Sequence, residues 1–465
     1  MAETQTVPTE LGTESIGKLL KKYAVPGIIA MTASSLYNMV DSIYIGHIPE
    51  TGSLAISGLA VTFPLMNLST ALGTLAGAGG ATLVSLLLGQ KNYKAANKVL
   101  ANVVSLNCII GLLFTVVCLA FLQPILGFFG ASANTMPYAC EYMKVILYGN
   151  VITHLYFGLN NIIRSSGNPK MAMGLTLFTV IFNSILDPIF IFGFGMGVKG
   201  AAWATVICQA ISLVWSIFYF TNKNRVLRLP KHIFDFNWRI AKDALAIGMG
   251  PFLMNSASCI VTMFINQQLL KYGGDLAIGA YGIVNRINFL FVMVVMGFNQ
   301  GMQPIAGYNF GARKYSRVRE VFKWTAVWAT IVTGFWFLAS EFCPGLLVGI
   351  FTNDETLKEI AIKGVRVMNP IVLVVGWQMV STNLFQSLGM VRKSIFLSLS
   401  RQLLYLVPLL YVLPLFWNVF GVFLAFPVAD LLACLTTLVM IASLMRKFSR
   451  LNDGDEPTEL GSTIS

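Results

Sequence analysis

Four of the ionisable side chains inside long apolar segments of this 465-residue chain stand out as candidates: Asp41, Asp187, Arg286 and Asp430. A charged residue at the centre of a membrane helix costs about 2.5–3.5 kcal/mol on insertion scales. Such a residue is retained where it faces a cavity or a partner. These four positions are therefore the first place to look for function.

Two of the acids, with two neutral polar residues, could form a cation site. Counted at 1.5 Å per helical residue, Asp41 lies roughly 9 Å and Asp187 roughly 12 Å below the outer ends of their expected helices. Thr205 lies about 8 Å into a third helix, and Asn183 shares a helix face with Asp187. Pro188 can kink that helix and free a backbone carbonyl. Oxygen ligands suit Na⁺, whereas desolvated acids could bind H⁺, and both ions stay open.

The other acid, Asp430, is not explained by that site. It lies roughly 14 Å below the outer end of its expected helix, and Arg286 lies roughly 12 Å below the end of another. Arg401 is expected to lie deeper, because its helix enters from the cytoplasmic side. We therefore expect an Asp430–Arg286 ion pair, since arginine suits bidentate pairing with a carboxylate. The alternative is that Asp430 faces a central cavity alone and attracts cationic molecules.

An internal repeat organises the helices that carry these residues, because the second half of the chain echoes the first at an offset of 222 residues. The matches are Leu54-Ala55-Ile56 with Leu276-Ala277-Ile278; Gly89, Lys91 and Tyr93 with Gly311, Arg313 and Tyr315; Gly127 and Phe129 with Gly349 and Phe351; and Asn161, Ser165, Gly167 and Lys170 with Asn383, Ser387, Gly389 and Arg392. A repeat of this size in an apolar chain predicts a transporter built from two lobes.

The composition predicts an all-α membrane protein, since 56% of residues are hydrophobic and only 11% are charged. A spanning helix needs about 20 mainly apolar residues. Twelve segments qualify: 16–46, 53–88, 95–123, 137–163, 170–194, 200–222, 240–270, 278–305, 318–342, 360–386, 394–416 and 420–445. Six fall in each half, so both lobes enter the membrane in the same direction. The pseudo-twofold axis that relates them should follow the membrane normal, with a central cavity between the lobes.

The basic residues set the orientation of these helices. They gather in the loops of one side: Lys18, Lys21, Lys22, Lys91, Lys94, Lys98, Arg164, Lys170, Arg313, Lys314, Arg317, Arg319, Lys323, Arg392, Lys393, Arg446, Lys447 and Arg450. That side should be cytoplasmic, together with both termini. The net charge of +12 thus reflects membrane topology, and no continuous face for nucleic acid is expected.

The same pattern gives the domain organisation. We expect an N-terminal six-helix lobe at 1–222, a cytoplasmic linker at 223–239, a C-terminal six-helix lobe at 240–450 and a disordered cytoplasmic tail at 451–465.

Motifs for enzymatic chemistry are missing from the sequence. The seven cysteines have no metal or redox spacing, and we expect no metal beyond Na⁺ and no cofactor. There is no HExxH motif, no nucleotide-binding loop and no plausible Ser/His pair, which argues against an intramembrane enzyme and an ATP-driven pump.

Taken together, these residues resemble those of the multidrug and toxic compound extrusion (MATE) family, over roughly residues 12–450. Within it, the chain is most similar to bacterial transporters of the MepA-like and DinF-like kind. The resemblance rests on the segments 38–46 (NMVDSIYIG), 89–93 (GQKNY), 164–169 (RSSGNP), 183–188 (NSILDP) and 200–205 (GAAWAT).

The resemblance implies a secondary antiporter in the bacterial inner membrane. It would export varied, often cationic, drugs in exchange for H⁺ or Na⁺ by alternating access, and we expect a monomer. The family's first-lobe cation site maps onto Asp41, Asn183, Asp187 and Thr205. NorM-like members also carry acids in the seventh and tenth helices, and 249–270 and 364–386 contain none. The alternative is a lipid-linked polysaccharide flippase of the same superfamily, although few basic residues lie at membrane depth.

Overall fold

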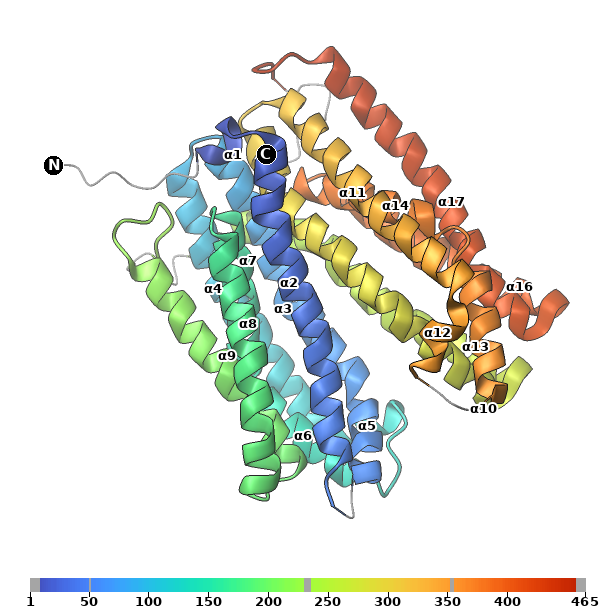
Figure 1. Ribbon diagram of the computed structural model, residues 1–465. Coiled ribbons are helices and arrows are strands. Elements are labelled where there is room, and N and C mark those ends of the chain that lie inside the picture. Colours follow the sequence, from blue (N-terminus) through green and yellow to red (C-terminus); the bar gives the residue numbers. More distant parts are fainter. Residues whose placement is uncertain (1–8, 50–51, 230–235, 352–354, 457–465) are drawn as a thin grey trace. The chain divides into compact units, whose positions relative to one another are not determined.

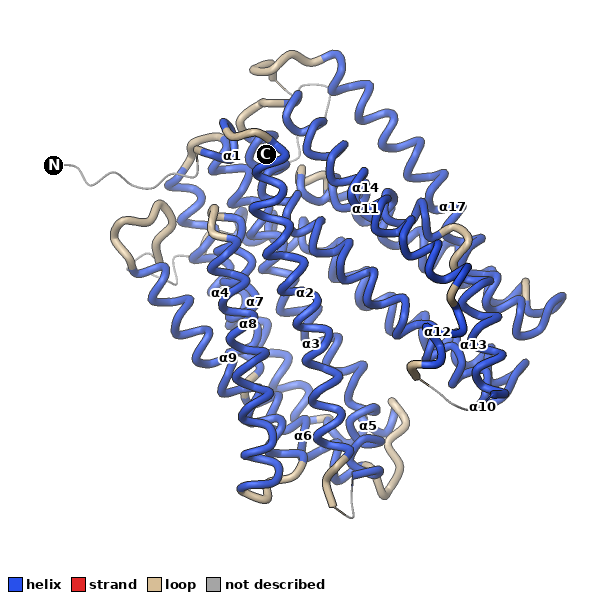
Figure 2. Tube along the Cα trace, in the orientation of Figure 1, coloured by secondary structure: helices blue, strands red, loops and turns tan. Residues whose placement is uncertain are grey.

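The computed structural model describes residues 9–49, 52–229, 236–351 and 355–456. Every regular element within these ranges is a helix (Figures 1 and 2). Helices satisfy their own backbone hydrogen bonds, so they are the natural form for an apolar chain in a bilayer. The predicted all-α fold class is confirmed.

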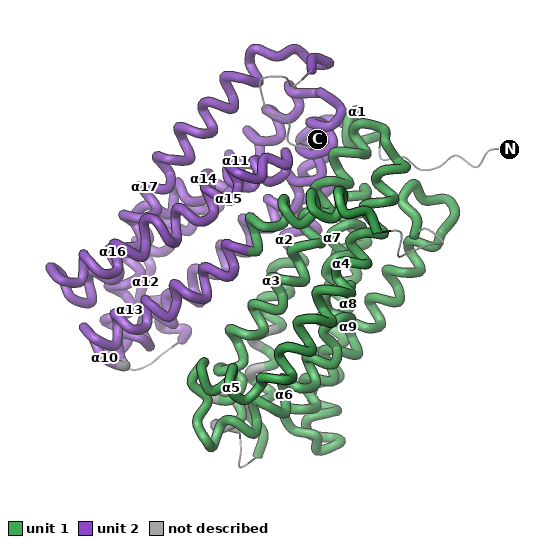
Figure 3. The backbone as a smooth tube through the Cα atoms, turned by 180° about the vertical axis from the view of Figure 1, so that it is seen from behind, with its two compact units in different colours: residues 1–13, 29–252 green, residues 14–28, 253–465 purple. Residues whose placement is uncertain are grey.

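The chain forms two compact units, residues 1–13 with 29–252 and residues 14–28 with 253–465 (Figure 3). Helices confined to the first unit are α1 (Glu10–Thr13), α3 (Gly52–Gly89), α4 (Tyr93–Ala120), α5 (Leu122–Phe128), α6 (Met136–Tyr148), α7 (Asn150–Ser165), α8 (Pro169–Pro188), η1 (Ile189–Gly193) and α9 (Val198–Thr221). Helices confined to the second are α11 (Tyr315–Phe342), α12 (Pro344–Gly349), α13 (Glu355–Met368), α14 (Val372–Ser387), α15 (Val391–Leu399), η2 (Ser400–Leu406), α16 (Val407–Val412) and α17 (Pro414–Arg450). Two further helices, α2 (Ile16–Gly46) and α10 (Trp238–Gly311), contribute to both units.

The membrane spans agree with the expected segments. Nine helices in the described chain are long and apolar enough to cross a bilayer, and the bent pair α13–α14 makes a tenth candidate. The two remaining expected segments correspond to α2, which has 31 residues, and to α6–α7, which breaks at Gly149. The protein is a multi-pass membrane protein.

The repeat is visible in backbone conformation. Lys91 and Arg313, which are 222 positions apart, have φ of 59° and 57° at the loop after the second helix of each half. Gly167 and Gly389, at the same offset, have φ of 103° and 70°. This left-handed region is uncommon for side chains other than glycine, so shared use at matched positions is specific. The register predicted from residue types is therefore present in the fold.

The repeat is also visible where the first helix of one half crosses the second helix of the other. In the first unit, a Cβ added to Gly79 of α3 would lie 1.8 Å from the carbonyl oxygen of Ala244 in α10. In the second unit, a Cβ added to Gly301 of α10 would lie 2.6 Å from Cα of Ala24 in α2. Gly79 and Gly301 are 222 positions apart. Both crossings thus depend on glycine for close backbone approach.

The sequence-based boundaries at 222 and 240 follow the repeat, whereas the two units follow packing. By packing, residues 16–28 of α2 join the second unit and residues 238–252 of α10 join the first. Of the expected linker, residues 230–235 lie outside the described residues. The part before them is anchored on α4, since Asn97 Nδ2 donates to the carbonyl of Val226 at 3.0 Å and Asn97 Oδ1 accepts from the amide of Arg228 at 2.6 Å.

The start of the C-terminal tail corrects the expectation of disorder from residue 451. The amide of Ser316 donates to Asp453 Oδ1 at 2.9 Å, and the amide of Gly454 donates to the carbonyl of Arg313 at 2.9 Å. The hydroxyl of Tyr315 donates to the carbonyl of Asp455 at 2.9 Å. Composition predicts disorder here because the tail is polar, but these hydrogen bonds fix residues 451–456 onto the start of α11. Residues 457–465 lie outside the described part.

Candidate functional site

Three helices of the first unit bring the predicted cation-site residues together. Asp41 comes from α2, Asn183 and Asp187 from α8, and Thr205 from α9. Asn183 and Asp187 are fully buried, and Asp41 and Thr205 are each 6% exposed. All four residues are therefore withdrawn from bulk solvent.

Asn183 lies at the centre of this cluster. Its amide is oriented by its partners, because only one orientation gives each atom a complementary group. The amide nitrogen then donates to Asp41 Oδ1 and to Asp187 Oδ2, each at 3.0 Å. The amide oxygen accepts from the backbone nitrogen of Thr205 at 3.1 Å and from its hydroxyl at 3.3 Å. One neutral side chain thus joins two carboxyl groups on different helices to the start of a third.

The carboxyl groups have other polar contacts but no basic partner. The two carboxyl groups lie close enough to interact with each other, and Tyr37 lies close to Asp41. The Tyr37 hydroxyl also lies 2.9 Å from Thr205 Oγ1. Asp187 Oδ1 is buried and has no hydrogen-bond partner within the described chain. Since no lysine or arginine there pairs with either acid, any negative charge must be neutralised from outside the protein.

Local backbone irregularity follows the second acid directly. The sequence predicts a disturbed helix at Pro188, and the chain continues beyond it as the π-helical turn η1. Proline lacks a backbone donor, so one α-helical hydrogen bond is lost at Pro188 and the helix is disturbed there. Single π-helical turns of this kind are frequent at functional sites.

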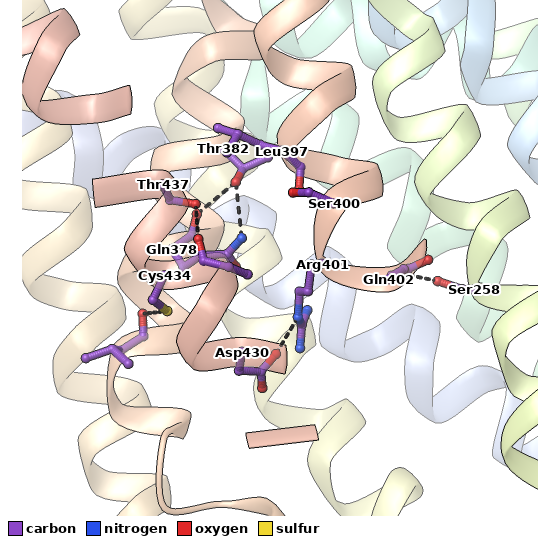
Figure 4. A network of polar contacts seen from close by, with 12 residues as sticks. Ser258, Gln378, Thr382, Leu397, Ser400, Arg401, Gln402, Asp430, Cys434 and Thr437 are labelled. Atoms are coloured by element: carbon purple, nitrogen blue, oxygen red, sulfur yellow. Dashed lines mark hydrogen bonds and ion pairs between the residues drawn. The ribbon is translucent and has the colours of Figure 1, made fainter. Parts of the chain in front are cut away.

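In the second unit, the predicted partner of Asp430 is wrong. Arg401 Nε donates to Asp430 Oδ1 at 2.6 Å (Figure 4). Arg286 is exposed and forms no ion pair with any described residue. Arg401 lies 11 residues before the end of α16 and Asp430 lies 12 residues after the break in α17 at Asn418, so both are roughly 17 Å from those ends. Arg286 lies 12 residues after the break in α10 at Gly274 and has a similar depth, so the face of the helix decides the pairing.

Further polar side chains surround this ion pair (Figure 4). Gln402 Nε2 donates to Ser258 Oγ at 2.7 Å, and Gln378 Nε2 lies 3.4 Å from the hydroxyl of Thr382. Arg401 and Gln402 are both in the π-helical turn η2, which packs against α17. The second unit thus carries its own polar network within apolar helices.

Sequence reasoning missed Tyr37 and Arg401. Tyr37 precedes Asp41 by four residues, so helical spacing alone placed it on the same face. Arg401 was considered and set aside on depth, because its distance was counted from the cytoplasmic side. Counted from the outer ends of their own helices, Arg401 and Arg286 have similar depths, so depth could not choose between them.

Comparison with known proteins gives consistent matches over most of the chain. The family model MatE matches residues 26–189 and 246–412. Multidrug export protein MepA of Staphylococcus haemolyticus (strain JCSC1435) is 28% identical over 442 residues, covering 94% of this chain and 95% of that protein. MepA of Staphylococcus aureus (strain NCTC 8325 / PS 47) is 28% identical over 425 residues, covering 91% and 93%.

Solved structures agree. The MATE multidrug transporter DinF-BH superimposes with a TM-score of 0.87 and 33% identity, covering 95% of this chain and 98% of that one. An outward-facing multidrug resistance MATE transporter of the MOP superfamily gives a TM-score of 0.90 at 21% identity, covering 96% and 99%. The second likeness concerns the fold alone. Together with the multi-pass helical fold, these matches show that the chain belongs to the MATE family of membrane transporters.

Proposed function

We propose that this protein is a secondary antiporter that exports varied, often cationic, organic compounds across the cell membrane in exchange for H⁺. Both termini face the cytoplasm, and the two repeats at 1–222 and 240–450 are the halves that alternate in access. Asp41, Asn183, Asp187 and Thr205 form the coupling site.

The observation that carries this proposal is the acid pair without a base. Asp41 and Asp187 share one amide nitrogen as donor, and no described basic side chain pairs with either. Two adjacent carboxyl groups repel each other when both are ionised. A cation taken from solution relieves that repulsion, and its release restores it. Binding at this site therefore responds to an ion gradient.

The orientation of Asn183 favours H⁺ over Na⁺. In the orientation that its hydrogen-bond partners assign, the amide nitrogen and not the oxygen faces the two carboxyl groups. An amide nitrogen cannot ligate Na⁺, whereas hard cations require oxygen ligands. A proton held between the carboxyl groups is compatible with the amide as it stands. Sodium coupling would require the amide to rotate, which replaces the two hydrogen bonds that its oxygen accepts from Thr205 with a single one, from Asn183 Nδ2 to Thr205 Oγ1 at 3.3 Å.

Transport by purified full-length protein in proteoliposomes tests the proposal. A fluorescent organic cation is loaded, and either a pH gradient or a Na⁺ gradient at equal pH is imposed. We expect the pH gradient to drive exchange and the Na⁺ gradient to leave transport at background. Exchange driven by the Na⁺ gradient alone would show that the coupling ion is Na⁺ and not H⁺. Transport of a lipid-linked saccharide with no ion dependence would support the flippase alternative and overturn the proposal.

A further inference from the structure

The ion pair of the second unit uses only part of each partner. Arg401 Nε and Asp430 Oδ1 form one hydrogen bond, and the two terminal guanidinium nitrogens have no partner in the described chain. Arginine and carboxylate commonly pair through two parallel hydrogen bonds. The fork of the guanidinium group is therefore open to a second acceptor.

The two partners also differ in access. The side chain of Arg401 is 34% exposed, whereas that of Asp430 is 12% exposed. An arriving molecule would thus meet the guanidinium group before the carboxylate. Arg401 lies roughly 17 Å along its helix from the outer end. It is therefore far from the membrane interface, where the long side chains of lysine and arginine can extend to water.

Neighbouring groups add capacity for hydrogen bonding. Gln402 follows Arg401 in η2, and its Oε1 is buried without a partner in the described chain. The register partner of Arg401 in the first repeat is Thr179, whose hydroxyl lies 2.8 Å from Ser212 Oγ. The charged pair is thus particular to the second unit, and the repeat alone does not require it.

We propose that Arg401 and Asp430 form a substrate subsite for compounds that carry a carboxylate, above all zwitterionic ones. The guanidinium fork binds the substrate carboxylate through its free nitrogens, and Asp430 holds the fork in place until substrate arrives. This inference extends the proposed export function from organic cations to molecules with both charges. It rests on that function for its context, but it concerns binding and not ion coupling.

A matched pair of dyes tests the subsite. Rhodamine 6G is a cationic ethyl ester, and its de-esterified acid is a zwitterion with the same ring system. Equilibrium binding of each dye is measured by fluorescence anisotropy on the full-length protein in detergent at neutral pH. The readout is the ratio of the two affinities, which a general loss of folded protein does not change.

The variants move this ratio in opposite directions. Arg401→Gln should weaken binding of the acid about tenfold relative to the ester, because a charged hydrogen-bond partner is lost. Asp430→Asn should raise the relative affinity for the acid, because it removes the competitor for the guanidinium group. The double variant Arg401→Gln/Asp430→Asn removes both charges, and it should bind the acid as weakly as Arg401→Gln does. Arg286→Gln is the matched control and should leave the ratio unchanged.

Several results would overturn the subsite. They are an equal loss of both dyes in Arg401→Gln, an unchanged ratio in that variant, or the same shift in Arg286→Gln. Failure of the export function is separate, because it would abolish gradient-driven transport of the ester and leave these equilibrium affinities as they are.

Discussion

The two units solve the problem of a buried acid in different ways. In the first unit, Asp41 and Asp187 are joined by the neutral amide of Asn183, and no basic side chain among the described residues forms an ion pair with either acid. In the second unit, Asp430 is paired with Arg401 at 2.6 Å. An acid with an internal cation has its charge balanced permanently, whereas an acid without one depends on a mobile cation. This difference is the basis on which we propose ion exchange in the first unit and a fixed charge arrangement in the second.

The largest effect should follow from neutralising the first-unit acids. Asp41→Asn and Asp187→Asn keep size and remove the exchangeable charge, so each should abolish gradient-driven efflux. We expect a loss on the order of 100-fold, the upper range of coupling between two sites. Initial rates in proteoliposomes measure it, with Asp243→Asn as a control acid on α10. Normal efflux by well-folded Asp41→Asn protein would remove the distinction between the units.

Substitutions of Asp430 and Arg401 in the second unit should change the stability of the protein. Asp430→Asn and Arg401→Gln should each lower the free energy of unfolding by about 1–3 kcal/mol, less than a fully buried pair because Arg401 is partly exposed. The double variant should recover part of the loss, because neither charge is then left alone. Thermal unfolding in detergent measures the stability of the wild-type protein, the two single variants and the double variant. Arg286→Gln, as a control, should leave the stability unchanged. Strictly additive losses would show that the pair contributes no coupling.

Much of this fold could be predicted from the sequence, because apolar segment length and punctuation are local signals. The register that pairs Lys91 with Arg313 was predicted, and both residues have a left-handed backbone conformation. Depth along a helix likewise predicted that Asp41, Asp187 and Thr205 would meet. Depth does not give the face of a helix, so the choice of Arg286 over Arg401 failed. Composition also could not predict the docking of residues 451–456, which depends on hydrogen bonds to α11.

A smaller effect should come from the amide that joins the acids. Asn183→Ala removes two hydrogen bonds to carboxyl groups but leaves both acids in place. We expect exchange to slow about tenfold, the equivalent of one such hydrogen bond. The same transport assay measures it, and Asn168→Ala at the start of α8 is an amide control. If Asn183→Ala matched Asp41→Asn in effect, the amide would be as essential as the acids.

The smallest effect concerns two segments held by hydrogen bonds to single side chains, residues 226–228 by the neutral Asn97 and residues 451–456 by the charged Asp453. Partial burial raises the pKa of Asp453, but hydrogen bonds from Ser316 and the charge of Arg319 outweigh it and lower the pKa below its ordinary value. A carboxyl group with a lowered pKa stabilises docking above its ordinary pKa and loses this effect as pH falls through the lowered value. Docking should therefore stay constant between about pH 5 and 8.

Asp453→Asn should speed hydrogen exchange in residues 451–456 by roughly two- to fivefold, the range of an exposed charged contact. Exchange in residues 222–229 should not change in this variant, which serves as the internal control. An equal change in both segments would mean that the attachments at Asn97 and at Asp453 are not independent.

The most direct test of the ion-exchange site is proton release when substrate binds. Purified protein in weakly buffered detergent is mixed with rhodamine 6G, and a pH indicator follows the proton. We expect the unsubstituted protein to release about one proton per bound dye, because drug and proton compete. Asp41→Asn should bind the dye and release none. Equal release by both proteins, or displacement of bound Na⁺ with no change in pH, would contradict the account.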